Sequence, residues 1–215
     1  MDDVSRETPL APASARGVFS PERYPLAEAY ARSLATAGVE RGLIGPREVP
    51  RLSERHLLNC AVVTDAVPDD LSVADVGSGA GLPGVVMAIR RPDLRVTLIE
   101  PLLRRATYLE EVAAELGLEN VSVVRARAED VDPRGGFDVV TSRAVAALDK
   151  LARWCMPLVA VGGEMLAMKG ERAPEEVTAS GRVLRQWSSG GAEVLTVGEG
   201  LLSPPTTLVR VVRTK

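Results

Sequence analysis

The stretch Val73-Ala-Asp-Val-Gly-Ser-Gly-Ala-Gly-Leu-Pro-Gly84 places four glycines within eight residues, directly after the apolar positions of a short predicted strand. Glycines at this density let the backbone turn sharply and approach a ligand more closely than side chains would allow. The apolar run at residues 85–89 is expected to open a helix whose first amide groups face that ligand. The sequence therefore predicts a strand, a glycine loop and a helix that together hold a nucleotide-like molecule.

Two classes of cofactor fit this loop. The spacing Gly79-x-Gly81-x-x-Gly84 satisfies the dinucleotide fingerprint. Asp75, however, lies where a carboxylate would repel a pyrophosphate, and it suits the positive sulfonium or ammonium of S-adenosylmethionine, either directly or through the loop amides. Glu100 ends the next predicted strand and could accept hydrogen bonds from a ribose diol, which both cofactors carry. We favour S-adenosylmethionine and keep a dinucleotide as the alternative.

Composition narrows the class of protein. The 215 residues are enough for one α/β domain with an extension, and an aromatic content of 3% implies an aliphatic core. Cys60 and Cys155 are too few for a disulfide framework, and with a single histidine they give no metal-ligand spacing, so no metal is expected. A net charge of −3 argues against non-specific coating of nucleic acid, although it leaves room for a local basic patch.

The chain contains no apolar run approaching the ~20 residues of a membrane span. It starts Met-Asp-Asp, which is acidic and is followed by no apolar segment, so no secretory signal is expected. These features predict a soluble cytoplasmic protein without a membrane partner, which we take to be a monomer.

The order of elements predicts a Rossmann-like α/β fold. Prolines among small residues predict a disordered tail over residues 1–20, and two amphipathic helices predict a helical extension over residues 21–69. Residues 70–215 then alternate strands with helices, which implies a mostly parallel seven-stranded sheet flanked by helices. The first five predicted strands are 71–76, 94–99, 121–124, 137–141 and 164–168. The predicted helices between and after these strands are 83–91, 103–116, 148–159 and 174–187. The last two predicted strands, 193–197 and 207–212, form an antiparallel hairpin at one edge of the sheet.

Ionisable residues occur where the predicted strands end. Asp75, Glu100, Glu129, Arg143 and Lys169 all lie at or just after the carboxyl end of a strand. Because these ends of a parallel sheet share one edge, the five side chains are expected around one crevice. Ordinary structural roles remain open for three of them, since Glu129 could open a turn and Arg143 and Lys169 could be solvated strand ends.

The second predicted helix carries a polar stripe. Arg51, Arg55 and Asn59 recur at helical spacing, and His56 is adjacent to them. Such a stripe is often only solvated surface, and a lone histidine more often makes a structural hydrogen bond than acts in catalysis.

Several of these motifs together resemble the RsmG family, also called GidB, which comprises bacterial methyltransferases acting on a guanine of 16S ribosomal RNA. The family's glycine loop is present from Asp75 to Gly84, its Arg-Ala-Glu element at residues 127–129, and its Ala-Arg-Ala-Val-Ala signature as Ser-Arg-Ala-Val-Ala at residues 142–146. Its helix motif appears as His56-Leu-Leu-Asn59-Cys60, with Asn59 where the family often has aspartate. This departure removes a negative charge and leaves a hydrogen-bonding group.

The resemblance implies a class I methyltransferase fold, an RNA guanine-N7 methyltransferase activity, and a site for S-adenosylmethionine. Its partner would be 16S ribosomal RNA or the small ribosomal subunit. The implied cofactor-binding residues are Asp75, Gly77, Gly79, Gly81, Leu82, Glu100, Ala128, Glu129 and Arg143. The implied catalytic residues are Arg143, His56 and Asn59, and the implied RNA-facing residues are Arg51, Arg55, Lys169 and Arg172.

The implied reaction needs little acid–base chemistry. Guanine N7 has an in-plane lone pair and requires no deprotonation, so the main tasks of the enzyme are alignment and desolvation. Arg143 should then contact guanine O6 or a phosphate, because a donor on N7 would occupy the attacking lone pair. The alternatives are a methyltransferase for a small molecule or protein, a nicotinamide oxidoreductase, and a non-catalytic ribosome-assembly factor.

Overall fold

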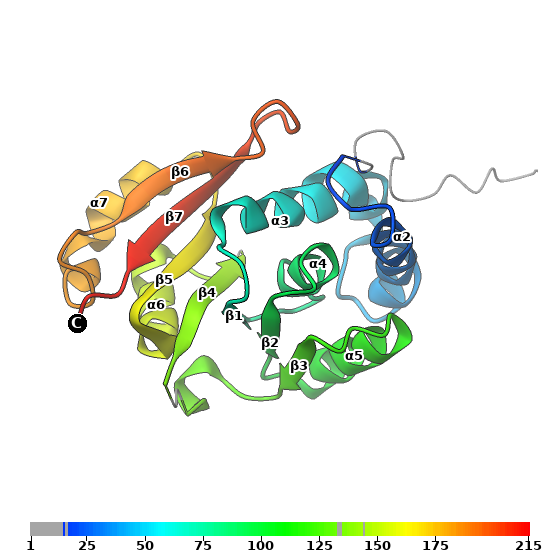
Figure 1. Cartoon of the computed structure of the whole chain (residues 1–215), viewed down its shortest axis with the longest axis horizontal. Coiled ribbons are helices and arrows are strands. Elements are labelled where there is room, and N and C mark those ends of the chain that lie inside the picture. The colour runs from blue at the N-terminus through cyan, green and yellow to red at the C-terminus, as the bar shows by residue number, and fades with distance from the viewer. Residues whose placement is uncertain (1–14, 16, 133–134, 144) are drawn as a thin grey trace, which may run out of the picture.

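The computed structural model describes residue 15 and residues 17–132, 135–143 and 145–215 of the chain. Within these residues one seven-stranded sheet runs through the molecule in the order β3-β2-β1-β4-β5-β7-β6 (Figure 1). The strands are β1 (Ser72–Val76), β2 (Arg95–Ile99), β3 (Val121–Val124), β4 (Phe137–Arg143), β5 (Val159–Lys169), β6 (Glu193–Val197) and β7 (Thr206–Val212). The first five are parallel, whereas β7 is antiparallel to both β5 and β6. This order confirms the predicted mostly parallel sheet with an antiparallel hairpin at one edge.

Helices cover both faces of the sheet because side chains alternate along each buried strand. On one face pack α4 (Gly84–Arg90) and α5 (Leu103–Glu115), together with the N-terminal helices. On the other pack α6 (Leu148–Cys155) and α7 (Ala173–Leu184), with the short turns η5 (Ala128–Asp130) and η6 (Met156–Leu158). The strand order reverses between β1 and β4, and ligands of such sheets bind at the carboxyl ends beside that switch.

The N-terminal extension consists of two helical segments. The first is α2 (Tyr24–Ser33), which continues as the wider turn η1 (Leu34–Gly38). The second runs through η2 (Pro46–Arg51), η3 (Leu52–Leu58), α3 (Asn59–Ala61) and η4 (Val62–Ala66). The sequence predicted one regular helix over 49–67, but Pro50 lacks an amide hydrogen, and the turns before and after it are tighter and wider than an α-helix. We call this second segment, residues 46–66, the cap segment.

Two predicted boundaries need correction. Residues 1–14 and 16 of the predicted disordered tail lie outside the described residues, but Ala15, Val18 and Phe19 are buried, and Arg90 donates a hydrogen bond to the Val18 carbonyl. The described fold therefore starts before residue 20. Strand β5 begins at Val159, five residues earlier than predicted, because Gly162 and Gly163 form an irregular part of the strand. A Cβ at Gly163 would lie 2.6 Å from the Asp138 carbonyl oxygen of β4, so only glycine fits.

None of the described helices combines the length and apolar character that crossing a membrane requires.

Candidate functional site

The glycine loop between β1 and α4 uses its glycines for different purposes. Gly77, Gly79 and Gly81 have φ angles of +71°, +58° and +96°, which favour glycine. A Cβ at Gly81 would lie 2.5 Å from the Val85 Cγ2 atom and 2.8 Å from the Tyr30 hydroxyl, so this position lets the loop pack on the helices. A Cβ at Gly79 would meet nothing closer than the Gly77 carbonyl at 3.8 Å. Gly79 is therefore the loop glycine that leaves open space for a ligand.

Asp75 lies fully buried beneath this loop in β1. Its Oδ2 atom accepts a hydrogen bond from the Gly84 amide at 3.0 Å, while its buried Oδ1 atom has no hydrogen-bond partner. Burial raises the pKa of Asp75 to about 6, although the Gly84 hydrogen bond opposes that shift. The carboxylate is thus a negative group held under the loop with one acceptor unused.

Glu100 follows β2 and fixes the loop from the other side. Its Oε2 atom accepts from the Gly79 amide and its Oε1 atom from the Leu102 amide, both at 3.0 Å, and only 1% of the residue is exposed. The Arg105 guanidinium lies 3.8 Å from Oε2. A carboxylate oxygen can accept more than one hydrogen bond, so both oxygens keep a lone pair for a diol.

A cavity of about 530 Å³ opens over this loop, and we call it the loop cavity. This volume lies within the usual range for small-molecule sites. Of the cofactor-binding residues predicted from the sequence, those that line it are Gly77, Gly79, Leu82, Glu100 and Arg143.

The other predicted cofactor residues do not line the loop cavity. Asp75 lies beneath the loop, and Gly81 belongs to the part of the loop that packs against Val85 and Tyr30. Ala128 is buried against the α6 and α7 side of the sheet, and Glu129 is exposed in the turn η5. In the structure, Ala128 and Glu129 follow the end of β3, but neither of them lines the loop cavity.

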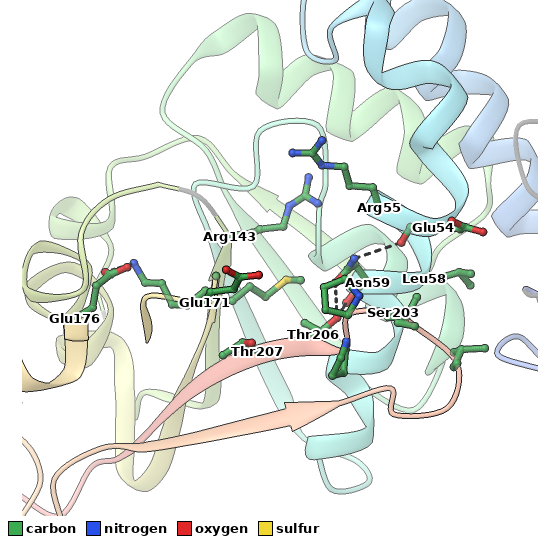
Figure 2. Close-up of a pocket in the computed structure, with 17 residues that line it drawn as sticks. Glu54, Arg55, Leu58, Asn59, Arg143, Glu171, Glu176, Ser203, Thr206 and Thr207 are labelled. Atoms are coloured by element: carbon green, nitrogen blue, oxygen red, sulfur yellow. Dashed lines mark hydrogen bonds and ion pairs between the residues drawn. The ribbon is translucent and has the colours of Figure 1, made fainter. Parts of the chain in front are cut away.

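A second cavity, of about 960 Å³, lies between the cap segment and the hairpin β6–β7 (Figure 2). We call it the hairpin cavity. The residues that line it come from four parts of the chain: Glu54, Arg55, Leu58 and Asn59 of the cap segment, Arg143 of β4, residues 168–171 and Glu176 around β5 and α7, and residues 201–207 before and within β7. Arg143 lines both cavities, and it therefore lies where they meet.

The half-buried side chain of Arg143 is held by the cap segment. Its two terminal nitrogens lie 3.1 and 3.2 Å from His56 Nδ1. The other ring nitrogen, Nε2, lies 2.9 Å from the Glu48 carboxylate. Desolvation lowers the pKa of His56, and the nearby Arg143 cation adds to this effect, while Glu48 opposes it. His56 is thus neutral near pH 7. Glu48 has no signal in the sequence, because its contact with His56 depends on the irregular turns of the cap segment.

Asn59 connects the cap segment to the hairpin. Its Oδ1 atom accepts a hydrogen bond from the Thr206 hydroxyl of β7, and its Nδ2 atom donates to the Glu54 carbonyl at 3.3 Å (Figure 2). The predicted catalytic residue Asn59 therefore shapes the hairpin cavity through a side-chain contact between distant segments.

The predicted RNA-facing residues differ in exposure. Arg51, Arg55 and Arg172 are exposed, and Arg55 also lines the hairpin cavity. The side chain of Lys169 is only 9% exposed, and its ammonium donates to the Ala146 carbonyl and the Glu176 carboxylate, both at 2.8 Å. Lys169 therefore ties β5 to α7 and has little free charge to offer a ligand.

The chain is similar to a protein-family model and to named proteins over most of its length. The protein-family model GidB, described as rRNA small subunit methyltransferase G, matches residues 23–199. A protein of Nocardioides sp. named Ribosomal RNA small subunit methyltransferase G is 60% identical over 211 residues, which cover 98% of this chain and 84% of that protein. A protein of Rhodococcus jostii with the same name is 57% identical over 204 residues, covering 94% and 89%.

Solved structures share the fold at low sequence identity. The TYW2 protein of P. horikoshii in complex with MeSAdo has a TM-score of 0.56 at 16% identity, covering 74% of this chain and 63% of that one. The ribosomal protein L11 methylase of Lactobacillus delbrueckii subsp. bulgaricus has a TM-score of 0.54 at 19% identity, covering 73% and 77%. These similarities confirm the predicted class I methyltransferase fold.

Proposed function

The chain belongs to the GidB family, rRNA small subunit methyltransferase G, and we propose that it transfers a methyl group from S-adenosylmethionine to N7 of a guanine in 16S ribosomal RNA. The observation that carries this proposal is the position of Arg143, which lines both the loop cavity and the hairpin cavity. A transferase needs its donor and acceptor in adjoining sites with the reacting atoms in line. The two cavities adjoin at the side chain of Arg143, so they can hold a donor and an acceptor next to each other.

The loop cavity suits S-adenosylmethionine. The open space above Gly79 leaves room for the methionine part, and Glu100, whose oxygens can each accept a further hydrogen bond, lines the same cavity and can bind a ribose diol. The unused Oδ1 atom of the buried Asp75 supplies negative charge beneath the loop, which favours a ligand with a positive end over a pyrophosphate. When bound, S-adenosylmethionine supplies an electrophilic methyl group on its sulfonium.

The hairpin cavity suits the guanine. Arginine carries more N–H groups than the two contacts to His56 use, so Arg143 can also donate to guanine O6 or to a phosphate. The N7 lone pair needs no base, and the task of Arg143 is to orient the ring toward the methyl group. Reaching N7 in a folded RNA requires an unpaired or extruded nucleotide. The exposed Arg51, Arg55 and Arg172 would contact the surrounding phosphates.

We further propose that a single copy acts in the cytoplasm on 16S ribosomal RNA or the small subunit. Residues of one chain line both cavities, which supports a monomeric enzyme.

The test is mass mapping of 16S ribosomal RNA from a strain lacking the gene. We expect one 7-methylguanosine to disappear, to return with the wild-type chain, and to return only in part with Arg143→Ala. Full modification in the Arg143→Ala strain would contradict the role of the cavity junction, and an unchanged RNA in the deletion strain would favour a non-catalytic assembly factor.

Titration calorimetry with S-adenosylmethionine and with NAD separates the two cofactor classes.

A further inference from the structure

Three ionisable side chains form one line of contacts from the surface to the junction of the cavities. Glu48 lies in η2, His56 in η3, and Arg143 at the end of β4. Glu48 contacts His56 Nε2 at 2.9 Å, and Arg143 contacts His56 Nδ1 through both terminal nitrogens. The histidine is 9% exposed, so water competes little for either ring nitrogen.

The chemistry of the partners determines where the histidine proton resides. A guanidinium only donates hydrogen bonds, so Nδ1 must present its lone pair to Arg143. An ionised carboxylate only accepts, so Nε2 must carry the hydrogen and donate it to Glu48. The hydrogen bond from His56 lowers the pKa of Glu48, which keeps this carboxylate ionised at neutral pH. The two neighbours therefore select the same neutral tautomer from opposite sides.

We propose that Glu48 is a positioning residue for methyl transfer: by holding His56 in the Nε2–H tautomer, it fixes the guanidinium of Arg143 where the two cavities meet. This inference rests on the proposed function and deepens it. It also assigns His56 a role different from that of a general base, because its only ring lone pair, on Nδ1, already accepts from Arg143.

If His56 did not hold the guanidinium of Arg143, this side chain would be free to change its orientation. Arg55 is a second cation acting on the same histidine, so removing Glu48 would leave the positive charges of Arg55 and Arg143 beside His56 without the carboxylate that opposes them. The side chain of Glu48 is 30% exposed, so removing it leaves no buried cavity and should not unfold the chain. The expected damage is to the orientation of Arg143.

The contact chain can be tested directly, because His56 is the one histidine in the sequence. In an untagged full-length chain labelled with ¹⁵N-histidine, long-range ¹H–¹⁵N spectra at pH 7 should show a neutral ring protonated at Nε2. Glu48→Gln should move the protonation of His56 to lower pH, because Glu48 raises the pKa of His56, and Arg143→Ala should move it to higher pH. A ring protonated at Nδ1, or a charged ring at pH 7, overturns the proposal.

Kinetics then separates positioning from folding. We expect Glu48→Ala to lower the single-turnover rate of methylation about 10-fold, a loss of the size found when a carboxylate that orients a metal-bound histidine is removed, with unchanged affinity for S-adenosylmethionine. The control is Glu40→Ala, which removes an exposed glutamate from the same N-terminal extension and should change neither value. An unchanged kcat in Glu48→Ala, or a loss matched by a lower melting temperature, overturns the proposal.

Two substitutions of His56 complete the test. Asparagine places an amide oxygen near the position of Nδ1, so His56→Asn should keep part of the activity. Protonation of His56 removes the Nδ1 lone pair that accepts from Arg143, so the wild-type rate should fall at acid pH. His56→Asn should abolish this fall. His56→Gln reaches toward Glu48 and should be the weaker enzyme. Complete inactivity of folded His56→Asn, equal to that of His56→Gln, identifies His56 as a base. A wild-type chain that methylates no RNA contradicts the proposed function, while the spectra still report on the contact chain.

Discussion

The loop cavity and the hairpin cavity meet at Arg143, yet they are built in opposite ways. The loop cavity is centred on the glycine loop, which supplies five of its thirteen lining residues from one stretch, residues 77–82, and Glu100 fixes that loop through the Gly79 amide. The hairpin cavity is formed by side chains from segments far apart in the sequence, and it is joined by contacts such as that between Asn59 and Thr206, which lie 147 positions apart. The backbone conformation of one short loop is therefore central to the donor half of the site, whereas contacts between distant segments form the acceptor half.

This difference predicts how each half responds to change. A backbone-built cavity is sensitive to side chains added at its glycines, whereas a cavity built from side chains is sensitive to loss of single contacts. Substitutions in the loop should therefore act on donor binding or on folding, and those in the hairpin cavity should act on turnover.

The largest expected effect comes from two glycines of the same loop. Gly79→Val should abolish detectable S-adenosylmethionine binding while costing about 1–2 kcal/mol of stability, because φ at this position is +58° and the added side chain enters the loop cavity. Gly81→Val should lower the free energy of unfolding by about 3 kcal/mol or more, because its Cβ would already overlap Val85 and the Tyr30 hydroxyl. Titration calorimetry and urea unfolding measure the two effects. Retained donor affinity in folded Gly79→Val would show that the loop cavity does not hold the donor.

Arg143 tests the junction itself. Arg143→Ala should lower single-turnover methylation about 100-fold, in the range seen when a positioned hydrogen-bond donor is removed from an active site. Arg143→Lys should recover only part of this loss, since lysine lacks the planar fork that contacts both His56 and a ligand. The measurement uses saturating RNA and donor. If lysine restored the full rate, positive charge alone would explain the role of Arg143.

The same difference explains what the sequence could predict. The Asp75–Gly84 motif, the mostly parallel sheet and the position of Glu100 follow from local patterns, because a parallel sheet brings strand ends to one edge. Glu48 could not be found this way, since helical spacing does not pair it with His56 until Pro50 and the irregular turns are known. The sequence predicted that Lys169 lies at a strand end, but it did not reveal the ion pair that Lys169 forms with Glu176 of α7.

Asp75 gives the donor half a dependence on pH. Its carboxyl group has a pKa of about 6 in the folded chain, against an ordinary value near 4, so the folded state binds protons more readily than the unfolded state. Stability from this group is present at acid pH and is lost as pH rises from about 4 to about 6, by about 3 kcal/mol in total. Asp75→Asn keeps an acceptor for the Gly84 amide and should remove this loss, so its advantage over wild type in urea unfolding should grow between pH 4 and pH 7.

That substitution should have the opposite effect on the ligand. Without the negative charge beneath the loop, Asp75→Asn should bind S-adenosylmethionine more weakly at pH 7 in calorimetry, despite its greater stability. A variant that gained stability and kept full affinity would show that Asp75 shapes the loop without acting on the charge of the donor.

The smallest expected effect concerns the contact that closes the acceptor half. Asn59 and Thr206 share a hydrogen bond between the cap segment and β7, and Asn59→Ala should cost about 1 kcal/mol of stability and reduce turnover mildly, with donor affinity unchanged. Thr206→Val removes the same hydrogen bond from the other side at similar volume. Because both changes remove one interaction, the double variant should cost less than the sum of the two single variants. Asn59→Asp keeps an acceptor for the Thr206 hydroxyl and should retain most of the stability. Strictly additive costs in urea unfolding would mean that the two residues stabilise the fold independently, and the hairpin cavity would then depend on other contacts between the cap segment and the hairpin.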